Sequence, residues 1–443
     1  MFYQKFSLGL ISLFTLWLLT FSSVLPEQTV STSKNPCEKK TLANGLSIIH
    51  QKDDSSPITV VQILIKGGKK AEPEGLSGLA YLTTQLALQI PDIKKVQDMM
   101  KQASQVYMIG KADYTLIKME CLSENLEATL NITTQIILKP LFSGLRINRT
   151  KEVMLYRRKI QEDDSINVGH NVTLEKFFTE TSYGGSAYGS EESLKAIKKK
   201  SIKKFHKDYF QAGNIIIAVI SDMEKEPLLE ILEKYFSKFP SGKSPELKQI
   251  TFSVPEEKKT SIIKDSKQYY ISLAYPLPES NPRNFVLASL LENLLGKGPG
   301  SRLWALRSKE KLAYNVNCSA TQMEDGGILK AYLETDKEKK EIALEALKTV
   351  LYDLYENGIT EEEFETTKIY TKASFLRKNE TKETRANNLA AFEALGLGFE
   401  YLNRFSQEIE TTGLEQINAY IKNILNPEYG LEIIVGPEHE KQR

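Results

Sequence analysis

Two stretches of the chain, far apart in the sequence, share one pattern of predicted structure. This repetition limits the possible folds more than any other feature. Residues 194–222, LKAIKKKSIKKFHKDYFQAGNIIIAVISD, and residues 414–437, LEQINAYIKNILNPEYGLEIIVGP, each predict a helix, a turn and a buried strand. Their offset is roughly 215 residues, far above the period of about 20–50 residues that is typical of solenoid repeats. The repetition therefore indicates two related domains within one chain.

The residues before the first of these stretches predict strands and then a helix. TLANGLSIIHQKD (41–53) and ITVVQILIKGG (58–68) predict a pair of strands, because apolar, β-branched runs are separated by Asn-Gly, Asp-Asp and Gly-Gly. A helix is expected within AEPEGLSGLAYLTTQLALQI (71–90), where leucines recur at helical spacing.

A segment with few helix or strand formers, FPSGKSPELKQ, separates the two halves, and SKQYYISLAYPLP and NFVLASLLENLLG then restart the pattern with a strand and a helix. Strands grouped with helices, without regular βαβ alternation, favour an α+β fold in which each domain is a mostly antiparallel sheet packed with helices. We divide the chain into an export signal and polar tail (1–37), an N-terminal domain (38–240), a linker (241–254) and a C-terminal domain (255–443).

The first residues predict an export signal. Leu8–Phe21, LGLISLFTLWLLTF, contains no charge and follows a single lysine, Lys5. This segment is shorter than the about 20 residues that a helix needs to span a bilayer, so we expect an exported protein, periplasmic or secreted. Because the following SSVLPEQ has no clean Ala-x-Ala cleavage site, an uncleaved membrane anchor remains the alternative.

Charge and cysteine content exclude two classes of protein. Lys+Arg 58 against Asp+Glu 57 gives a formal net charge of +1, so no nucleic acid partner is expected. The densest basic run, KKKSIKK, lies in an amphipathic pattern and predicts a solvated helix face. Cys37, Cys121 and Cys318 allow at most one disulfide, so the chain is not a disulfide-built scaffold.

Several ordered blocks resemble those of the insulinase/pitrilysin zinc peptidases, whose subunits include those of mitochondrial processing peptidase. EPEGLSGLAYLTTQ resembles the family block Glu-Pro…Gly-Leu-Ala-His-x-x-Glu-His. SAYGSEESLKAI with FHKDYFQAGNIIIAVISD, then LLGKGPGSRLWALRSKEKLAYNV, NGITEEEFETTK and VGP are similar to later blocks in the same order. The resemblance covers most of residues 40–437 and implies two homologous domains that form half of a clamshell.

The resemblance fails at the zinc motif. In the family, His-x-x-Glu-His puts two imidazoles one helical turn apart to bind zinc, and its Glu activates the bound water. Here those positions are Tyr81, Thr84 and Gln85. Tyrosine and glutamine are not credible zinc ligands, and threonine cannot act as a general base near neutral pH. By itself, the chain is therefore not expected to hold zinc or to be a zinc peptidase.

No other residues supply the missing ligands. The family's third ligand is a Glu on a later helix, which here is KEVMLYRRKIQED; the alignment leaves Tyr156 or Arg157 at that position, with Glu162 as the nearest alternative. The four histidines lie apart in the sequence, and no two are four residues apart; they are His50, His170, His206 and His439. We expect His206 to be a packing or surface residue.

The second half keeps a different family feature. SRLWALRSKEKLAY resembles the block with an arginine and a tyrosine seven residues apart, which are Arg307 and Tyr314 here. In the family these groups face the zinc across the chamber and donate hydrogen bonds to the substrate backbone and to the developing oxyanion. The alternative is an ordinary surface ion-pair donor and a phenol at the edge of the core. Arg302 in the same block could be mistaken for Arg307 or could orient the helix.

Some family members are two-chain assemblies in which one subunit carries zinc and the other keeps only the Arg/Tyr pair. The leading hypothesis is a non-catalytic subunit of such a heterodimer, with a homologous zinc-bearing partner subunit and an unfolded peptide as substrate. The only cofactor expected is zinc in the partner. One alternative is a structural or peptide-binding homologue with no part in hydrolysis, and a homodimer is also left open. The third hypothesis is a hydrolase with a non-zinc mechanism. No GxSxG motif, Cys/His pair or carboxylate dyad stands out to support it.

Overall fold

The computed structural model describes residues 36–242, 245–296 and 298–438. Except for residues 36 and 37, the predicted export signal and tail lie outside these residues, and so does His439. In the part of the chain that the structure describes, no helix is both long enough and apolar enough to cross a membrane. The three cysteines, all described, are free thiols.

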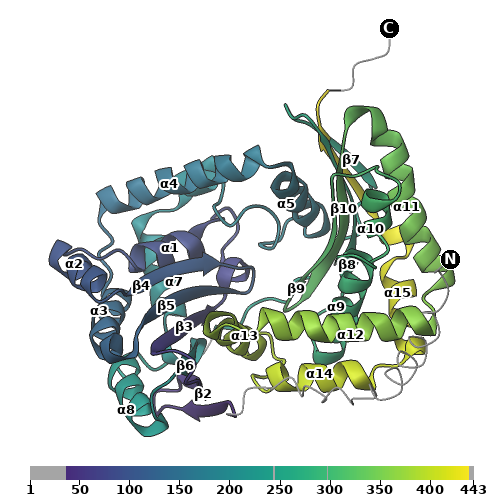
Figure 1. The fold of residues 1–443 in the computed structure, drawn as a ribbon. Coiled ribbons are helices and arrows are strands. Elements are labelled where there is room, and N and C mark those ends of the chain that lie inside the picture. The colour runs from purple at the N-terminus through teal and green to yellow at the C-terminus, as the bar shows by residue number, and fades with distance from the viewer. Residues whose placement is uncertain (1–35, 243–244, 297, 439–443) are drawn as a thin grey trace, which may run out of the picture. The chain divides into compact units, whose positions relative to one another are not determined.

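Strands of the N-terminal half form a six-stranded sheet, sheet A, in the order β1-β2-β6-β3-β5-β4 (Figure 1). Strands β2 and β6 are parallel, and all other neighbours are antiparallel. The strands are β1 (Glu38–Thr41), β2 (Ser47–Lys52), β3 (Ile58–Lys66), β4 (Gln105–Gly110), β5 (Tyr114–Leu122) and β6 (Ile215–Ser221).

Strands of the C-terminal half form a five-stranded sheet, sheet B, in the order β7-β11-β8-β10-β9. Here β7 and β11 are parallel, and the other neighbours are antiparallel. The strands are β7 (Lys259–Ile263), β8 (Tyr269–Leu277), β9 (Asn315–Met323), β10 (Gly326–Thr335) and β11 (Leu431–Gly436).

Apart from β1, the two sheets have the same strand order and directions. The closing strands β6 and β11 occupy equivalent places, each parallel to the first strand and antiparallel to the second. The α+β prediction with two mostly antiparallel sheets is therefore confirmed, although each sheet contains one parallel pair. The described part of the linker has no helix or strand, but the exact domain boundaries stay a prediction.

The predicted pairing of the first two long strands is wrong, because β6 lies between β2 and β3. Every residue of β6 is buried, and its sequence IIIAVIS suits a central strand that is covered on both faces. The loop at residues 53–57 is long enough to pass one intervening strand, since neighbouring strands lie about 4.8 Å apart and an extended residue spans about 3.3 Å.

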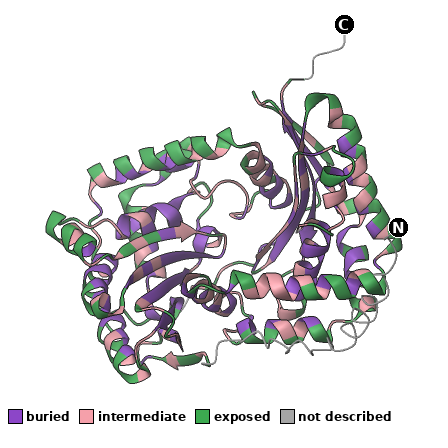
Figure 2. Ribbon diagram, viewed as in Figure 1, coloured by how far each residue is buried: buried purple, intermediate pink, exposed green. Residues whose placement is uncertain are grey.

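Helices cover both sheets, and Figure 2 shows that their outer faces carry most of the exposed residues while the strands are largely buried. The helices of the N-terminal half are η1 (Gly68–Ala71), α1 (Leu79–Ala87), α2 (Ile93–Lys101), η2 (Ser123–Asn125), α3 (Leu126–Leu138), α4 (Gly144–Asp163), α5 (Ser165–Phe177), α6 (Glu191–Ala196), α7 (Lys199–Tyr209), η3 (Ala212–Asn214) and α8 (Lys225–Phe236). Those of the C-terminal half are α9 (Pro282–Gly296), α10 (Trp304–Ser308), η4 (Lys337–Lys339), α11 (Lys340–Asn357), α12 (Glu361–Lys378), α13 (Lys382–Ala394), α14 (Tyr401–Thr411), α15 (Leu414–Ile424) and η5 (Pro427–Tyr429).

The two halves exchange a helix, which the sequence pattern did not predict. Helix α5 of the N-terminal half packs on β8 and β11 of sheet B, whereas α13 of the C-terminal half packs on β3 and β6 of sheet A (Figure 1). Gly169 on α5 permits the close approach, because a Cβ at this position would lie 2.2 Å from the ring of Tyr270 on β8. The exchange joins the halves through their apolar cores.

A buried polar junction reinforces this connection. Lys70, next to η1, forms ion pairs with Asp325 (2.6 Å) and Glu324 (2.8 Å) in the turn between β9 and β10. The Asp113 carboxylate accepts hydrogen bonds from the Tyr183 hydroxyl and from the Glu324 backbone N–H. The β9–β10 turn is therefore fixed to the N-terminal half by charge-assisted hydrogen bonds.

Candidate functional site

Helix α1 holds the three residues that stand in place of the zinc motif, and its start is defined by two features. Gly78 caps the helix with φ 93°, a left-handed conformation that favours glycine. The buried Glu72 carboxylate accepts hydrogen bonds from the backbone N–H groups of Gly78 (3.1 Å) and Ala80 (2.9 Å). A carboxylate at this end also interacts favourably with the helix dipole, so Glu72 holds the first turn in place.

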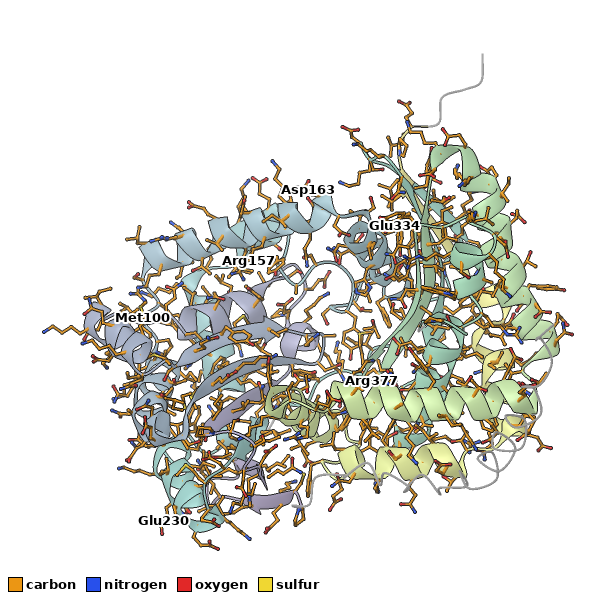
Figure 3. The ribbon with its side chains drawn as sticks, in the orientation of Figure 1. Met100, Arg157, Asp163, Glu230, Glu334 and Arg377 are labelled. Atoms are coloured by element: carbon orange, nitrogen blue, oxygen red, sulfur yellow. The ribbon has the colours of Figure 1, made fainter. Side chains whose placement is uncertain are left out.

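Tyr81 and Arg157 contact each other directly. The Arg157 guanidinium, on α4, donates a hydrogen bond to the Tyr81 hydroxyl, and Figure 3 shows Arg157 on the side of α4 that faces α1. Tyr81 is only 6% exposed, and its ring packs edge-to-face on Tyr188 at 4.9 Å. Burial raises the pKa of Tyr81, and the charge of Arg157 opposes that increase. Two positions that resemble zinc-ligand positions are thus joined by a hydrogen bond.

The other motif positions offer no metal ligand either. The Thr84 hydroxyl donates to the Ala80 carbonyl within the same helix at 3.0 Å, and Gln85 is half-buried. Of the candidates for the third position, Tyr156 is 66% exposed, and Glu162 forms an ion pair with Arg158 at 2.7 Å. The geometry therefore selects Arg157, the residue that reaches Tyr81.

No metal site appears elsewhere in the described ranges 36–242, 245–296 and 298–438, which contain no group of three or more His, Cys, Asp or Glu side chains that could hold an ion. His206 is a packing residue: a ring nitrogen lies 2.7 Å from the Ile137 carbonyl oxygen, and the ring stacks on Phe210 at 4.4 Å. Burial lowers the pKa of His50. The zinc chemistry that the resemblance implies does not fit the residues present.

Arg307 and Tyr314 are both exposed, in contrast to Tyr81. Arg307 lies on α10 with its guanidinium 5.0 Å from the Trp304 ring. Tyr314 precedes β9 and is 77% exposed, while its backbone N–H donates to the Glu334 carbonyl at 2.9 Å. Among the described residues, no hydrogen bond or ion pair joins this pair to the motif positions on α1. Their assignment to substrate binding stays a prediction.

Arg302 has a structural role that distinguishes it from Arg307. Its guanidinium donates to Glu363 through Nε and Nη2, both at 3.0 Å, and pairs with Asp353 at 2.7 Å. A third acceptor is the Gly358 carbonyl at 3.1 Å. Arg302 therefore ties the segment before α10 to α11 and α12.

Three lysines of the described residues are buried, Lys69, Lys330 and Lys382, and the sequence analysis singled out none of them. Lys69 is 7% exposed and donates to three backbone carbonyls: those of Tyr183 (2.9 Å), Gly184 (3.0 Å) and Gly185. Lys330 is 3% exposed in the middle of β10. The signal for Lys330 was present, since a lysine interrupts the apolar run GGILKAYLET.

A pocket of about 380 Å³ lies near the start of α1. Its lining includes Ser77, Arg158 and Glu175, together with residues 178–190 in part, and contains no histidine or cysteine. None of the positions selected from the sequence lines it. The pocket offers polar groups for binding but no nucleophile with an adjacent base.

Two family models match the chain. Residues 47–191 match insulinase (peptidase family M16), and residues 196–370 match the peptidase M16 inactive domain. The chain belongs to peptidase family M16. The resemblance inferred from the sequence blocks is thereby confirmed. The motif positions on α1 fall within the first match, and Arg307 and Tyr314 fall within the second.

Relatives in this family differ in whether they are named as peptidases. The uncharacterized zinc protease YmxG of Bacillus subtilis (strain 168) is 21% identical over 403 residues, which cover 90% of this chain and 98% of that protein. The non-peptidase homolog YmxG of Helicobacter pylori (strain ATCC 700392 / 26695) is 22% identical over 408 residues, covering 90% and 91%. A chain of complex III2 from Candida albicans, with Inz-5 bound, has a similar fold, with a TM-score of 0.78, 16% identity, and coverage of 90% and 95%.

Proposed function

We propose that the chain is a non-catalytic subunit of a heteromeric M16 peptidase, paired with a homologous zinc-bearing subunit that acts on unfolded peptides. The observation that carries this proposal is the hydrogen bond between Tyr81 and Arg157. It occupies two positions where the resembled family has ligands, so this chain lacks a ligand set of its own. Hydrolysis then depends on the partner subunit.

In this proposal Arg307 and Tyr314 are the chain's contribution to a shared site. A guanidinium and a phenol O–H can donate to the peptide backbone and to a carbonyl oxygen that gains negative charge during hydrolysis. Both side chains are exposed, which leaves them accessible to a substrate held by another subunit. They orient the peptide and stabilise charge, while the reacting water belongs to the partner.

The comparisons support the two parts of the proposal separately. A relative named as a non-peptidase homolog supports a chain without catalysis of its own. Similarity to a chain of complex III2, a multi-subunit assembly, supports a role within a complex. An exported location belongs to the proposal as well, because of the apolar segment Leu8–Phe21.

The same similarity to complex III2 favours one alternative, a structural or peptide-binding subunit with no part in hydrolysis. The two functions differ in whether they need Arg307 and Tyr314. A subunit of a shared active site needs both hydrogen-bond donors for turnover, whereas a structural subunit needs neither.

The test uses the complex of this chain with a zinc-bearing M16 subunit from the same cell. Tyr314→Phe removes one hydrogen-bond donor and keeps the ring, so turnover should fall by about 10²–10³, the usual cost of losing one oxyanion donor. Assembly and zinc content should not change. The effect on kcat should exceed the effect on KM, because the donor acts mainly in the transition state.

Two exposed residues elsewhere provide matched controls. Tyr352→Phe removes a phenol O–H from α11, and Arg377→Ala removes a guanidinium that also lies near an aromatic ring, 5.8 Å from Tyr370. Both controls should retain the unmodified rate. If the double variant Arg307→Ala/Tyr314→Phe also cleaves peptide at that rate, the shared site is rejected and the structural alternative gains support.

A further inference from the structure

Lys330 is a buried cation without a conventional partner. It lies in the middle of β10, is 3% exposed, and its ammonium is 5.2 Å from the Tyr332 ring and 5.7 Å from the Tyr270 ring. Within the described residues it forms no hydrogen bond or ion pair. Cation–π contacts stabilise such a group only in part, whereas an ammonium removed from water has three donors to satisfy.

Burial is the largest influence on the Lys330 ammonium, and the two groups that favour its charge act from a distance. Burial lowers the pKa of Lys330 to about 8, and Asp164 and Cys318 oppose this only through space. The Asp164 carboxylate already caps α5 by accepting from the Asn167 backbone N–H at 2.9 Å. Among the described residues, Asp164 acts on the ammonium only through space, so the ammonium keeps donors for a further acceptor.

The charge of Lys330 also acts on His170, which lies on the exchanged helix α5. Burial, the largest cause, and the nearby charges of Lys330, Lys69 and Lys111 together lower the pKa of His170 to about 4. Lys330 is thus one of three ammonium groups whose charges act on His170.

Toward the edge of sheet B, the neighbours of Lys330 are neutral polar residues. Strand β9 is the edge of sheet B, and Ser319 and Asn317 pair opposite Lys330 and Tyr332. Both β9 residues are half-buried, so this border is not sealed from solvent. The Tyr270 hydroxyl is buried beside the Ser272 side chain and can donate to the same ligand.

We propose that Lys330, with the Tyr270 hydroxyl and the polar border of β9, binds a carboxylate of an extended peptide. This inference rests on the proposed function only in taking a peptide as the ligand. The carboxylate accepts a charge-assisted hydrogen bond from the ammonium, and its chain leaves past β9. Its source is either an Asp or Glu side chain or the peptide's C-terminus.

A carboxylate fits this site better than a phosphate. Phosphate sites in proteins usually combine arginine forks or several backbone N–H groups, since three oxygens need donors. Lys330 is a single ammonium between two rings, and among the described residues no arginine contacts it. The chain's formal net charge of +1 also gives no general attraction for polyanions.

The experiment measures binding of fluorescent unfolded peptides to the full chain by anisotropy. One internal residue of the peptide is either Glu or Gln, and the C-terminus is either a free acid or an amide, in all combinations. Lys330→Met removes the charge and Lys330→Arg retains it. Lys422→Met is the matched control, because Lys422 also lies over a tyrosine, at 4.0 Å from the Tyr355 ring, but is exposed and paired with Glu356.

We expect the wild-type chain to bind one carboxylate form about 10- to 100-fold more tightly than its amide counterpart, the range for hydrogen bonds to charged groups. Lys330→Met should abolish this preference, Lys330→Arg should keep part of it, and Lys422→Met should keep all of it. Whether Glu or the free C-terminus gives the preference identifies the source.

Three results overturn the inference, and they differ in what they say of the proposed function. Equal binding of acid and amide peptides rejects the carboxylate site but leaves peptide binding intact. No binding of any peptide rejects both. A preference that persists in a folded Lys330→Met chain, with an unfolding transition as cooperative as that of the wild type, also rejects the site.

Discussion

Two buried lysines, one beside each sheet, differ in how their charge is stabilised. Lys69, beside sheet A, donates to three backbone carbonyls in residues 183–185 and lies near the Glu72 carboxylate. Lys330, in sheet B, lies between two tyrosine rings and has no hydrogen-bond acceptor among the described residues. The two lysines are nearly equally buried, at 7% and 3% exposed, so the difference is in their partners and not in their access to water.

The candidate sites show the same contrast. Around α1, Tyr81 contacts Arg157 and Glu72 caps the helix, so the polar groups are satisfied within the chain. In the C-terminal half, Arg307 and Tyr314 are exposed. Because the two sheets share one topology, the fold does not require this difference. The N-terminal site therefore satisfies its polar groups within the chain, whereas Arg307 and Tyr314 leave theirs open to solvent.

The largest expected effect tests the two lysines against each other. Lys69→Met leaves three carbonyls and a buried carboxylate without their cation, so the free energy of unfolding should fall by about 3–5 kcal/mol. Lys330→Met removes an unpaired buried charge, so stability should stay the same or rise. Urea unfolding of both variants measures the difference. Equal destabilisation by the two substitutions would show that the two lysines do not differ in their contribution to stability.

A smaller effect is expected where the two halves exchange helices. Gly169→Ala places a Cβ 2.2 Å from the buried Tyr270 ring, and such overpacking costs about 1–3 kcal/mol. Gly144→Ala is the control, since this glycine begins α4 with nothing within 4 Å of the added Cβ. The control should change stability by less than about 1 kcal/mol. A Gly169→Ala protein as stable as the control would show that the α5 contact is loose.

His170→Gln is expected to have the smallest effect on stability at neutral pH. The folded pKa of His170 is about 4 and lies below the ordinary value of 6.5, so the unfolded chain takes up the proton first as the pH falls. Stability from this group is complete above pH 6.5 and is lost progressively toward pH 4. His170→Gln removes the titration, so the variant should gain stability relative to the wild type over that range.

The comparison between the two proteins is needed because other groups titrate too. Burial raises the pKa of Asp113 to about 6, which has the opposite sign and strengthens folding as the pH falls. Asp113 is present in both proteins, so its effect cancels in the difference. A stability difference that stays constant from pH 7 to pH 4 would contradict the lowered pKa of His170.

Much of the fold could be predicted from local patterns, because those patterns are set by burial along each element. The closing stretches predicted β6 and β11, and leucine spacing predicted α1. The strand order and the helix exchange could not be predicted in this way. The position of β6 between β2 and β3, and of α5 on sheet B, depends on long-range packing that periodicity does not record.

The candidate site divides in the same way. Comparison with the family motif located Tyr81, Thr84 and Gln85, and it left Tyr156 and Arg157 as equal alternatives. Only the structure selects Arg157, since one residue along a helix turns the side chain by about 100°. Lys330 was visible as a lysine within an apolar strand, and strand alternation places Tyr332 on the same face. Tyr270 comes from the neighbouring strand β8, which sequence spacing does not record.

The most direct test of the account is zinc content, measured by elemental analysis after mild chelation on two purified proteins. One is the wild-type chain, and the other restores the family motif through Tyr81→His, Thr84→Glu, Gln85→His and Arg157→Glu. We expect no stoichiometric zinc in the wild type and stoichiometric zinc in the restored variant, because α1 and α4 already lie side by side at these positions. Stoichiometric zinc in the wild-type chain would contradict the claim that the hydrogen bond between Tyr81 and Arg157 has replaced the metal.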